Sequence, residues 1–282
     1  DQVMARFPWV QMIVFSELAP YGPLPGNHPE CVEAAIDVFR EAAQRHNVWI
    51  LPGSMFERSA TGLYNVASVL NPQGEVVTKY AKMFPFLPYE SGVESGTEFC
   101  VFDVPDVGRF GVSICYDIWF PETTRQLTSQ GVEVLLHPVL TGTTDRDAEV
   151  AIARATAAQF QCYVFDVNGL AAGGVGKSLV VDPTATVLHQ SGGQEDMFPI
   201  EIDLDMVRRQ RETGMKGLGQ VLKSFRDREA DFPVYDRSSG ADAYLHTLGP
   251  LETPQQGSRA GVSSVDPRTA LGGDPHAPLG AQ

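Results

Sequence analysis

The chain has 282 residues, 43% of them hydrophobic, and a formal net charge of −14 at pH 7. Phosphate binding needs clustered Lys and Arg, so this acidic balance argues against nucleic acid as a partner. No apolar run approaches the roughly 18 residues of a membrane span, and no signal peptide is recognisable. The four cysteines form no CxxC pair. We therefore expect a cytoplasmic protein with free thiols, without a zinc site or a disulfide framework.

The spacing of apolar residues predicts two halves in which strands and helices alternate. The buried strand expected at residues 12–15 is followed by Glu17, at the strand end where α/β sheets place functional groups. Two sheets packed face to face, with helices outside, would account for so many buried strands. The predicted strands are 12–15, 48–51, 64–70, 76–80, 99–104, 110–115, 132–137, 162–167, 178–182, 186–189 and 198–202, and the predicted helices are 29–47, 122–130, 145–160 and 203–211.

Residues 111–122 (GVSICYDIWFPE) are typical of an apolar strand that ends at Cys115 and enters a helix. Pro121 suits the first helical turn, and Glu122 suits the positive end of the helix dipole. A thiol on such a turn lies at the edge of a sheet, near backbone N–H groups that can bind a developing anion. Cys115 is thus a candidate nucleophile, although a lone cysteine is more often a small buried hydrophobe.

A Pro-broken aromatic loop at residues 79–92 carries two further candidates, Lys82 and Glu90. A thiol is only slightly ionised at neutral pH, so it needs a base or a cation beside it. Glu17 can accept the thiol proton. Lys82 can stabilise the thiolate and then an oxyanion, with the backbone N–H of Tyr116 as a second donor. Glu90 is expected to orient Lys82 or to help position the substrate.

Three segments resemble the signature segments of the nitrilase, or carbon–nitrogen hydrolase, superfamily. They are FSE at residues 15–17, KYAK at 79–82 and SICYDIWFPE at 113–122, and the gaps of 65 and 33 residues between Glu17, Lys82 and Cys115 also match. Glu90 falls where the family has a second glutamate. Together with residues 173–183, which are similar to a later hairpin segment, the resemblance covers residues 7–236.

The resemblance implies a four-layer αββα sandwich over residues 1–236 and hydrolysis of small amides without a metal or cofactor. Cys115 would be the nucleophile and Glu17 the general base, with Lys82 and Glu90 completing the catalytic set. Ammonia or an amine would leave as a thioester forms, and water would then release the acid. A homodimer or higher homo-oligomer is implied. The Gly-, Pro- and Ser-rich residues 237–282 are expected to form an extended or disordered tail on a neighbouring subunit.

The loop MFPFLPYESG and the short spacing from Lys82 to Glu90 most resemble the aliphatic amidase and formamidase branch. Nitrile-hydrolysing members tend to carry Cys-Trp-Glu where this chain has Cys-Tyr-Asp. Family members also have a first strand and most of a helix ahead of the FSE segment, whereas sixteen residues precede Glu17 here. The sandwich is therefore expected to lack its first strand, which would leave an unpaired sheet edge.

Substrate contacts are expected from residues that follow the catalytic loops and strands. His137 serves equally well as a structural histidine, and Asp117 is expected to tie down the helix after Cys115. The candidates for substrate binding are Tyr89, Tyr116, Trp119, His137, Val139 and Thr141.

The remaining cysteines, Cys31, Cys100 and Cys162, are expected to be structural. Two other functions remain open. One is a catalytically idle sandwich that acts as a binding or scaffold module. The other is a different activity of the same superfamily, that of a nitrilase, carbamoylase or acyltransferase.

Overall fold

The computed structural model describes residues 1–26 and 32–253. The described chain forms two compact units. The first contains both sheets and comprises residues 1–85 and 92–226. The second comprises Phe86–Ser91 and the chain from Asp227 onward. The predicted end of the catalytic domain at residue 236 stays a prediction.

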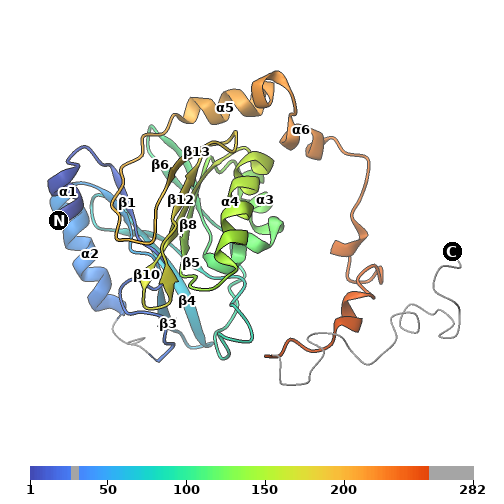
Figure 1. Cartoon of the computed structure of the whole chain (residues 1–282), viewed down its shortest axis with the longest axis horizontal. Coiled ribbons are helices and arrows are strands. Elements are labelled where there is room, and N and C mark those ends of the chain that lie inside the picture. The colour runs from blue at the N-terminus through green and yellow to red at the C-terminus, as the bar shows by residue number, and fades with distance from the viewer. Residues whose placement is uncertain (27–31, 254–282) are drawn as a thin grey trace, which may run out of the picture. The chain divides into compact units, whose positions relative to one another are not determined.

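The first sheet, sheet A, is built from the N-terminal strands (Figure 1). Its two parallel strands, β1 and β2, are followed by an antiparallel hairpin closed by Asn71, whose Oδ1 accepts the backbone N–H groups of Gln73 and Glu75. β1 lies at one end of the order β1-β2-β4-β3, and β5 pairs with β4. The strands are β1 (Met12–Val14), β2 (Trp49–Leu51), β3 (Met55–Arg58), β4 (Leu63–Leu70) and β5 (Val76–Ala81).

The second sheet, sheet B, has the order β13-β12-β9-β8-β7-β6. Its central strands β7, β8 and β9 are parallel, so their carboxyl ends meet at one edge of the sheet. Cys115, Thr141 and Asn168 come from these three ends. The strands are β6 (Cys100–Val104), β7 (Gly108–Val112), β8 (Val134–Val139), β9 (Tyr163–Asn168), β12 (Leu179–Val181) and β13 (Val187–Gln190); β10 (Leu170–Ala171) and β11 (Gly174–Val175) form a separate small hairpin.

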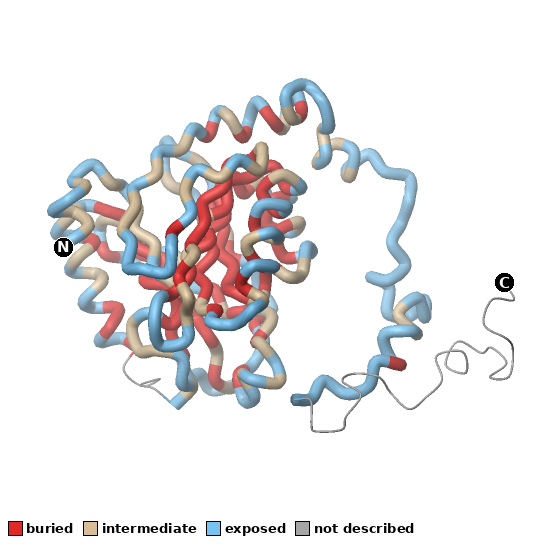
Figure 2. The backbone as a smooth tube through the Cα atoms, viewed as in Figure 1, coloured by how far each residue is buried: buried red, intermediate tan, exposed pale blue. Residues whose placement is uncertain are grey.

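The core lies between the two sheets. Leu51 and Val69 of sheet A belong to one buried cluster with Phe110 and Leu136 of sheet B. Both sheets therefore use one face for the same apolar layer, and Figure 2 shows these strands as the buried centre of the first unit. This face-to-face packing matches the prediction made from the number of buried strands.

Helices cover the outer faces of both sheets (Figure 1). Ile36 of α2 is buried with Leu70 of sheet A, and Ala157 and Phe160 of α4 are buried with Val164 of sheet B. The order of layers is thus helix, sheet A, sheet B, helix, as predicted. The helices are α1 (Gln2–Arg6), α2 (Val32–His46), α3 (Pro121–Ser129), α4 (Arg146–Phe160), α5 (Leu204–Thr213) and α6 (Val221–Arg226), with 3₁₀ turns η2 (Cys115–Trp119) and η3 (Met215–Gly217). No helix of the described residues is long and apolar enough to cross a membrane.

The second unit contains little regular structure. Phe86 stacks against Tyr89 with ring centroids 5.2 Å apart, and its backbone N–H donates to Glu90 Oε2. Beyond Asp227 the described chain has the 3₁₀ turns η4 (Pro233–Tyr235) and η5 (Leu245–Leu248), with mostly exposed side chains. Residues 254–282 of the predicted tail, and Cys31, lie outside the described residues.

Two predicted details of secondary structure were wrong, and several short elements were missed. Residues 198–202 form no strand: Pro199 lacks an N–H for a ladder, and Phe198 instead stacks on His189. The strand predicted to end before Pro138 is β8, and it continues to Val139. Beyond Leu136, β8 no longer pairs with β7 and has only β9 as its partner, so Pro138 is tolerated there. Strand β3, the hairpin of β10 and β11, and helices α1 and α6 were not predicted.

Candidate active site

Glu17 and Lys82 form a buried ion pair. Lys82 Nζ donates to Glu17 Oε1 at 2.9 Å, and only 1% and 3% of the two side chains is exposed. Asn65, buried on β4, donates from Nδ2 to the same oxygen at 2.8 Å. An ion pair is costly to bury unless further hydrogen bonds satisfy it, and Asn65 supplies one. Two members of the predicted catalytic set, 65 residues apart in the sequence, are therefore in contact.

The backbone on both sides of this pair is held by the sheets. The Glu17 N–H donates to the carbonyl of Val139 at the end of β8, at 3.3 Å. The same carbonyl accepts the N–H of Gly169 from the end of β9. Lys82 N–H donates to the Asn65 carbonyl at 2.8 Å. The base segment from sheet A is thus attached directly to the strand ends of sheet B.

Gly53 allows the Glu17 segment to pass close to the loop after β2. Its φ is +82°, and a Cβ atom there would lie 1.8 Å from the Ser16 carbonyl oxygen. Only glycine combines this backbone conformation with so close an approach. Gly53 therefore makes room for Ser16, the residue next to Glu17.

Cys115 is the first residue of the 3₁₀ turn that follows β7. Its φ of +48° lies in the left-handed region, which costs a non-glycine residue roughly 1–2 kcal/mol. Such conformations persist where the surrounding structure enforces them, and they cluster at active sites. The predicted strand-to-helix turn is present, with α3 beginning at Pro121 as expected.

The electrostatics of the thiol link it to the ion pair. Burial raises the pKa of Cys115 well above its ordinary value; the charge of Glu17 raises this pKa further, and the charge of Lys82 lowers it. The side chain is 8% exposed. At neutral pH the thiol is therefore protonated, and it needs a base to become a nucleophile.

Asp117 ties the cysteine turn to the lysine segment. Its Oδ2 accepts the Ile114 N–H at 2.8 Å and the Tyr80 hydroxyl at 2.7 Å, and its Oδ1 accepts the Phe84 N–H at 2.9 Å. Burial raises the pKa of Asp117 to about 6, so at pH 7 it is mainly the acceptor that these three donors require. The predicted structural role of Asp117 matches this geometry.

The predicted substrate contacts lie in different environments. Tyr116 and Trp119 are half-buried on the turn after Cys115. Val139 belongs to the core between the sheets. Tyr89 and Glu90 belong to the second unit, so their contribution to this site stays a prediction, as do the roles of the other residues.

His137 lies fully buried on β8. Its Nδ1 is 2.7 Å from the Ser113 hydroxyl, and its Nε2 has no hydrogen-bond partner within the described chain. Burial lowers the pKa of His137 to about 3, so the imidazole is neutral at pH 7. The hydrogen bond to Ser113 fits the structural role considered for this residue.

Sequence reasoning missed Asn65, Glu149 and Asn168. Asn65 and Asn168 are polar residues inside apolar strands, which was a usable signal because a buried amide needs partners. Glu149 had no such signal, since an acidic residue in the first turn of a helix is ordinarily exposed. In the structure it is 3% exposed and faces Thr141 and Trp119.

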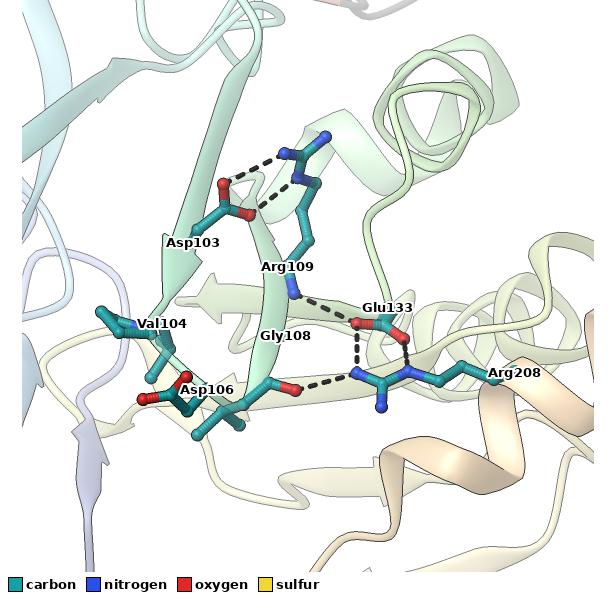
Figure 3. Close-up of a pocket in the computed structure, with 9 residues that line it drawn as sticks. Asp103, Val104, Asp106, Gly108, Arg109, Glu133 and Arg208 are labelled. Atoms are coloured by element: carbon teal, nitrogen blue, oxygen red, sulfur yellow. Dashed lines mark hydrogen bonds and ion pairs between the residues drawn. The ribbon is translucent and has the colours of Figure 1, made fainter.

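A hollow of about 450 Å³ lies away from these residues, at the turn between β6 and β7 (Figure 3). Four of its charged side chains form two ion pairs, Arg109 with Asp103 and Arg208 with Glu133. None of its lining residues is a thiol, a hydroxyl or a histidine. This hollow therefore carries ion pairs rather than a catalytic set.

The carbon-nitrogen hydrolase family model matches residues 3–212 of the chain. The chain therefore belongs to the carbon–nitrogen hydrolase family. It is 29% identical to the 2-oxoglutaramate amidase of Bacillus subtilis over 180 aligned residues. The aligned region covers 62% of this chain and 69% of that protein.

Solved structures share the fold. A carbon-nitrogen hydrolase from Helicobacter pylori G27 superimposes with a TM-score of 0.72 at 24% identity, over 84% of this chain and 89% of that one. A cysteine-to-alanine mutant of the amidase from Nesterenkonia sp. AN1, in complex with butyramide, gives a TM-score of 0.66 at 20% identity, over 74% and 84% of the two chains. The predicted superfamily, the sandwich fold and an enzyme of the amidase type are confirmed.

Proposed function

We propose that this enzyme hydrolyses the C–N bond of a small amide with Cys115 as nucleophile, Glu17 as general base and Lys82 as oxyanion donor. One observation carries the assignment of roles: a buried Glu17–Lys82 ion pair acts electrostatically on a thiol held in a left-handed turn. A buried acid, a buried base and a protonated thiol are the groups that acyl transfer through a thioester requires.

Acylation begins with the thiol protonated. Glu17 takes the Cys115 proton as Sγ attacks the amide carbon, and the carbonyl π electrons move to oxygen. The resulting oxyanion is stabilised by Lys82 and by the backbone N–H of Tyr116. The oxyanion then collapses, the C–N bond breaks, and Glu17 returns the proton to the leaving nitrogen. Ammonia or an amine departs and a thioester remains.

Deacylation repeats these steps with water. Glu17 takes a proton from a water molecule as the water oxygen attacks the thioester carbon. The C–S bond breaks, the proton returns to the sulfur, and the carboxylic acid leaves. Glu17 can act in both half-reactions because its backbone is attached to β8 through Val139, close to the turn that carries Cys115. In this scheme Glu90 orients Lys82 or the substrate.

An amide panel tests this function. The panel contains formamide, butyramide and 2-oxoglutaramate, because relatives and neighbours include a formamidase, a butyramide-bound amidase and a 2-oxoglutaramate amidase. We expect ammonia release from at least one amide, and a quenched sample should carry the acyl mass on the peptide that contains Cys115. Release of ammonia only from the matched nitriles would contradict amide hydrolysis, and no turnover with any compound would favour the idle binding protein.

The proposal includes a homo-oligomer. The second unit exposes large apolar side chains, among them Tyr235 (59%) and Leu251 (71%), which is unusual for a surface that stays in water. The proposal also includes a cytoplasmic location, which the free thiols Cys100, Cys115 and Cys162 support.

Light scattering tests the assembly. The expected molar mass is at least twice the 30.7 kDa of one chain. The double variant Phe232→Ser/Tyr235→Ser should shift the protein toward monomer, whereas Leu188→Ser, which changes an exposed apolar residue of the first unit, should not. A monomeric wild type at tens of micromolar would contradict the proposal.

A further inference from the structure

Thr141 lies beside the nucleophile and is held from three directions. Its Oγ1 is 3.8 Å from Cys115 Sγ. The Asn168 amide clamps its backbone, accepting the Thr141 N–H at 2.8 Å and donating to the Thr141 carbonyl at 3.0 Å. Its hydroxyl donates to Glu149 Oε1 at 3.1 Å. All four residues are buried, so the hydroxyl occupies one defined position at the sulfur.

Glu149 is in turn held by groups that only donate. Trp119 Nε1 donates to Oε1 at 3.3 Å, and Arg146 Nη1 donates to Oε2 at 3.3 Å. Arg146 is itself fixed by an ion pair with Asp166 and by the Lys177 carbonyl at 2.9 Å. This buried chain of contacts maintains Glu149 as an acceptor for the Thr141 hydroxyl.

The direction of the contact with the sulfur follows from proton counting. A hydroxyl has one proton and two acceptor lone pairs. The Thr141 hydroxyl donates its one proton to Glu149 Oε1, and the Trp119 and Arg146 groups that hold this carboxylate are donors as well. At Cys115 the hydroxyl can therefore only accept, and the bond is S–H···O. A hydrogen bond to the neutral form of an acid opposes its ionisation.

We infer that Thr141 is a positioning residue for Cys115: its hydroxyl, oriented by Glu149, accepts a hydrogen bond from the thiol and holds the protonated sulfur in a single orientation until substrate binds. The charged groups that act on the thiol are Glu17, Lys82 and Glu149, from the loop after β1, the end of β5 and helix α4. The effect on turnover rests on the proposed amidase function, but the effect on the thiol does not.

The test compares Thr141→Val with Thr141→Ser. Valine keeps the shape and removes the hydroxyl, whereas serine keeps the hydroxyl and removes a methyl group. For Thr141→Val we expect a lower kcat, by roughly 10-fold, the size of one hydrogen bond, because the sulfur is no longer held in one orientation toward the amide carbon; KM should be unchanged. In the pH profile of Cys115 alkylation by iodoacetamide, the midpoint of Thr141→Val should fall below that of the wild type, because the acceptor that favours the thiol is gone. Thr141→Ser should behave like the wild type in both assays.

Each contrary outcome has a distinct meaning. A rise of the alkylation midpoint in Thr141→Val would show that the hydroxyl donates to the thiolate, which overturns the inference. Equal losses in the valine and serine variants would assign the effect to packing of the methyl group, and this also overturns it. If the wild type hydrolyses no amide, the alkylation profile still decides the role of Thr141 while the proposed function fails.

Discussion

Replacement of Cys115 by alanine is expected to abolish amide hydrolysis while leaving the fold intact. Without the sulfur no thioester forms, and loss of a covalent nucleophile lowers kcat by about 10⁴-fold or more. The alanine also removes the acyl mass from the trapped peptide. The substitution removes a single sulfur atom and leaves the backbone as it is, so its cost in packing is small. Ammonia release and intact-protein mass spectrometry measure both effects.

Two further variants make the result specific. Cys115→Ser should be nearly as inactive as the alanine variant, because a hydroxyl is a much weaker acid than a thiol. Cys162→Ala removes a fully buried thiol whose pKa burial raises to about 12, and which lies in the apolar cluster of Ala157, Phe160 and Val164 rather than at the site. It should keep the wild-type kcat and lose about 1 kcal/mol of stability. Retention of turnover in Cys115→Ala would refute covalent catalysis by this residue.

Replacement of Lys82 by methionine should damage both activity and stability. Methionine fills a similar volume, but Glu17 keeps only its hydrogen-bonded partners and loses the ammonium. Removing one member of a buried ion pair typically costs about 3–5 kcal/mol of unfolding free energy. Loss of an oxyanion donor lowers kcat by about 10²–10³-fold. Without the positive charge the pKa of Cys115 should also rise, since Lys82 lowers it.

Lys79, on β5 three residues before Lys82, provides the matched control. It is paired with Glu57 at 2.8 Å, as Lys82 is with Glu17, but its side chain is 39% exposed. Lys79→Met should therefore change stability by no more than about 1 kcal/mol and leave kcat unchanged. Urea unfolding and ammonia release give the two quantities. If the two methionine variants lose similar stability and activity, burial of the Lys82 pair has no special role.

The fold and the central residues were accessible from the sequence because they depend on local patterns. Apolar runs that end at Glu17 and Cys115 mark strands whose carboxyl ends lie at a sheet edge, and Pro121 marks the helix that follows. The order and spacing of the motifs then brought Glu17, Lys82 and Cys115 together. The ion pair observed between Glu17 and Lys82 is what that grouping anticipates.

The supporting contacts could not be predicted, since they join residues that no local pattern relates. Glu149 lies in a helix turn where an exposed acid is ordinary, and only the packing of α4 places it on Thr141. The ion pair between Arg146 and Asp166 spans twenty residues and has no sequence signature. Strand β3 was missed because its four residues end in Glu57 and Arg58, which favour a loop.

The Val139 carbonyl receives the Glu17 N–H from one side and the Gly169 N–H from the other. The base therefore comes from the sheet A side and the nucleophile from sheet B, and the Val139 carbonyl joins the base segment to the sheet that carries the nucleophile. Catalytic activity therefore depends on how sheet A packs against sheet B. A substitution deep in the apolar layer between them, far from any reacting atom, acts on turnover through the distance between proton acceptor and sulfur.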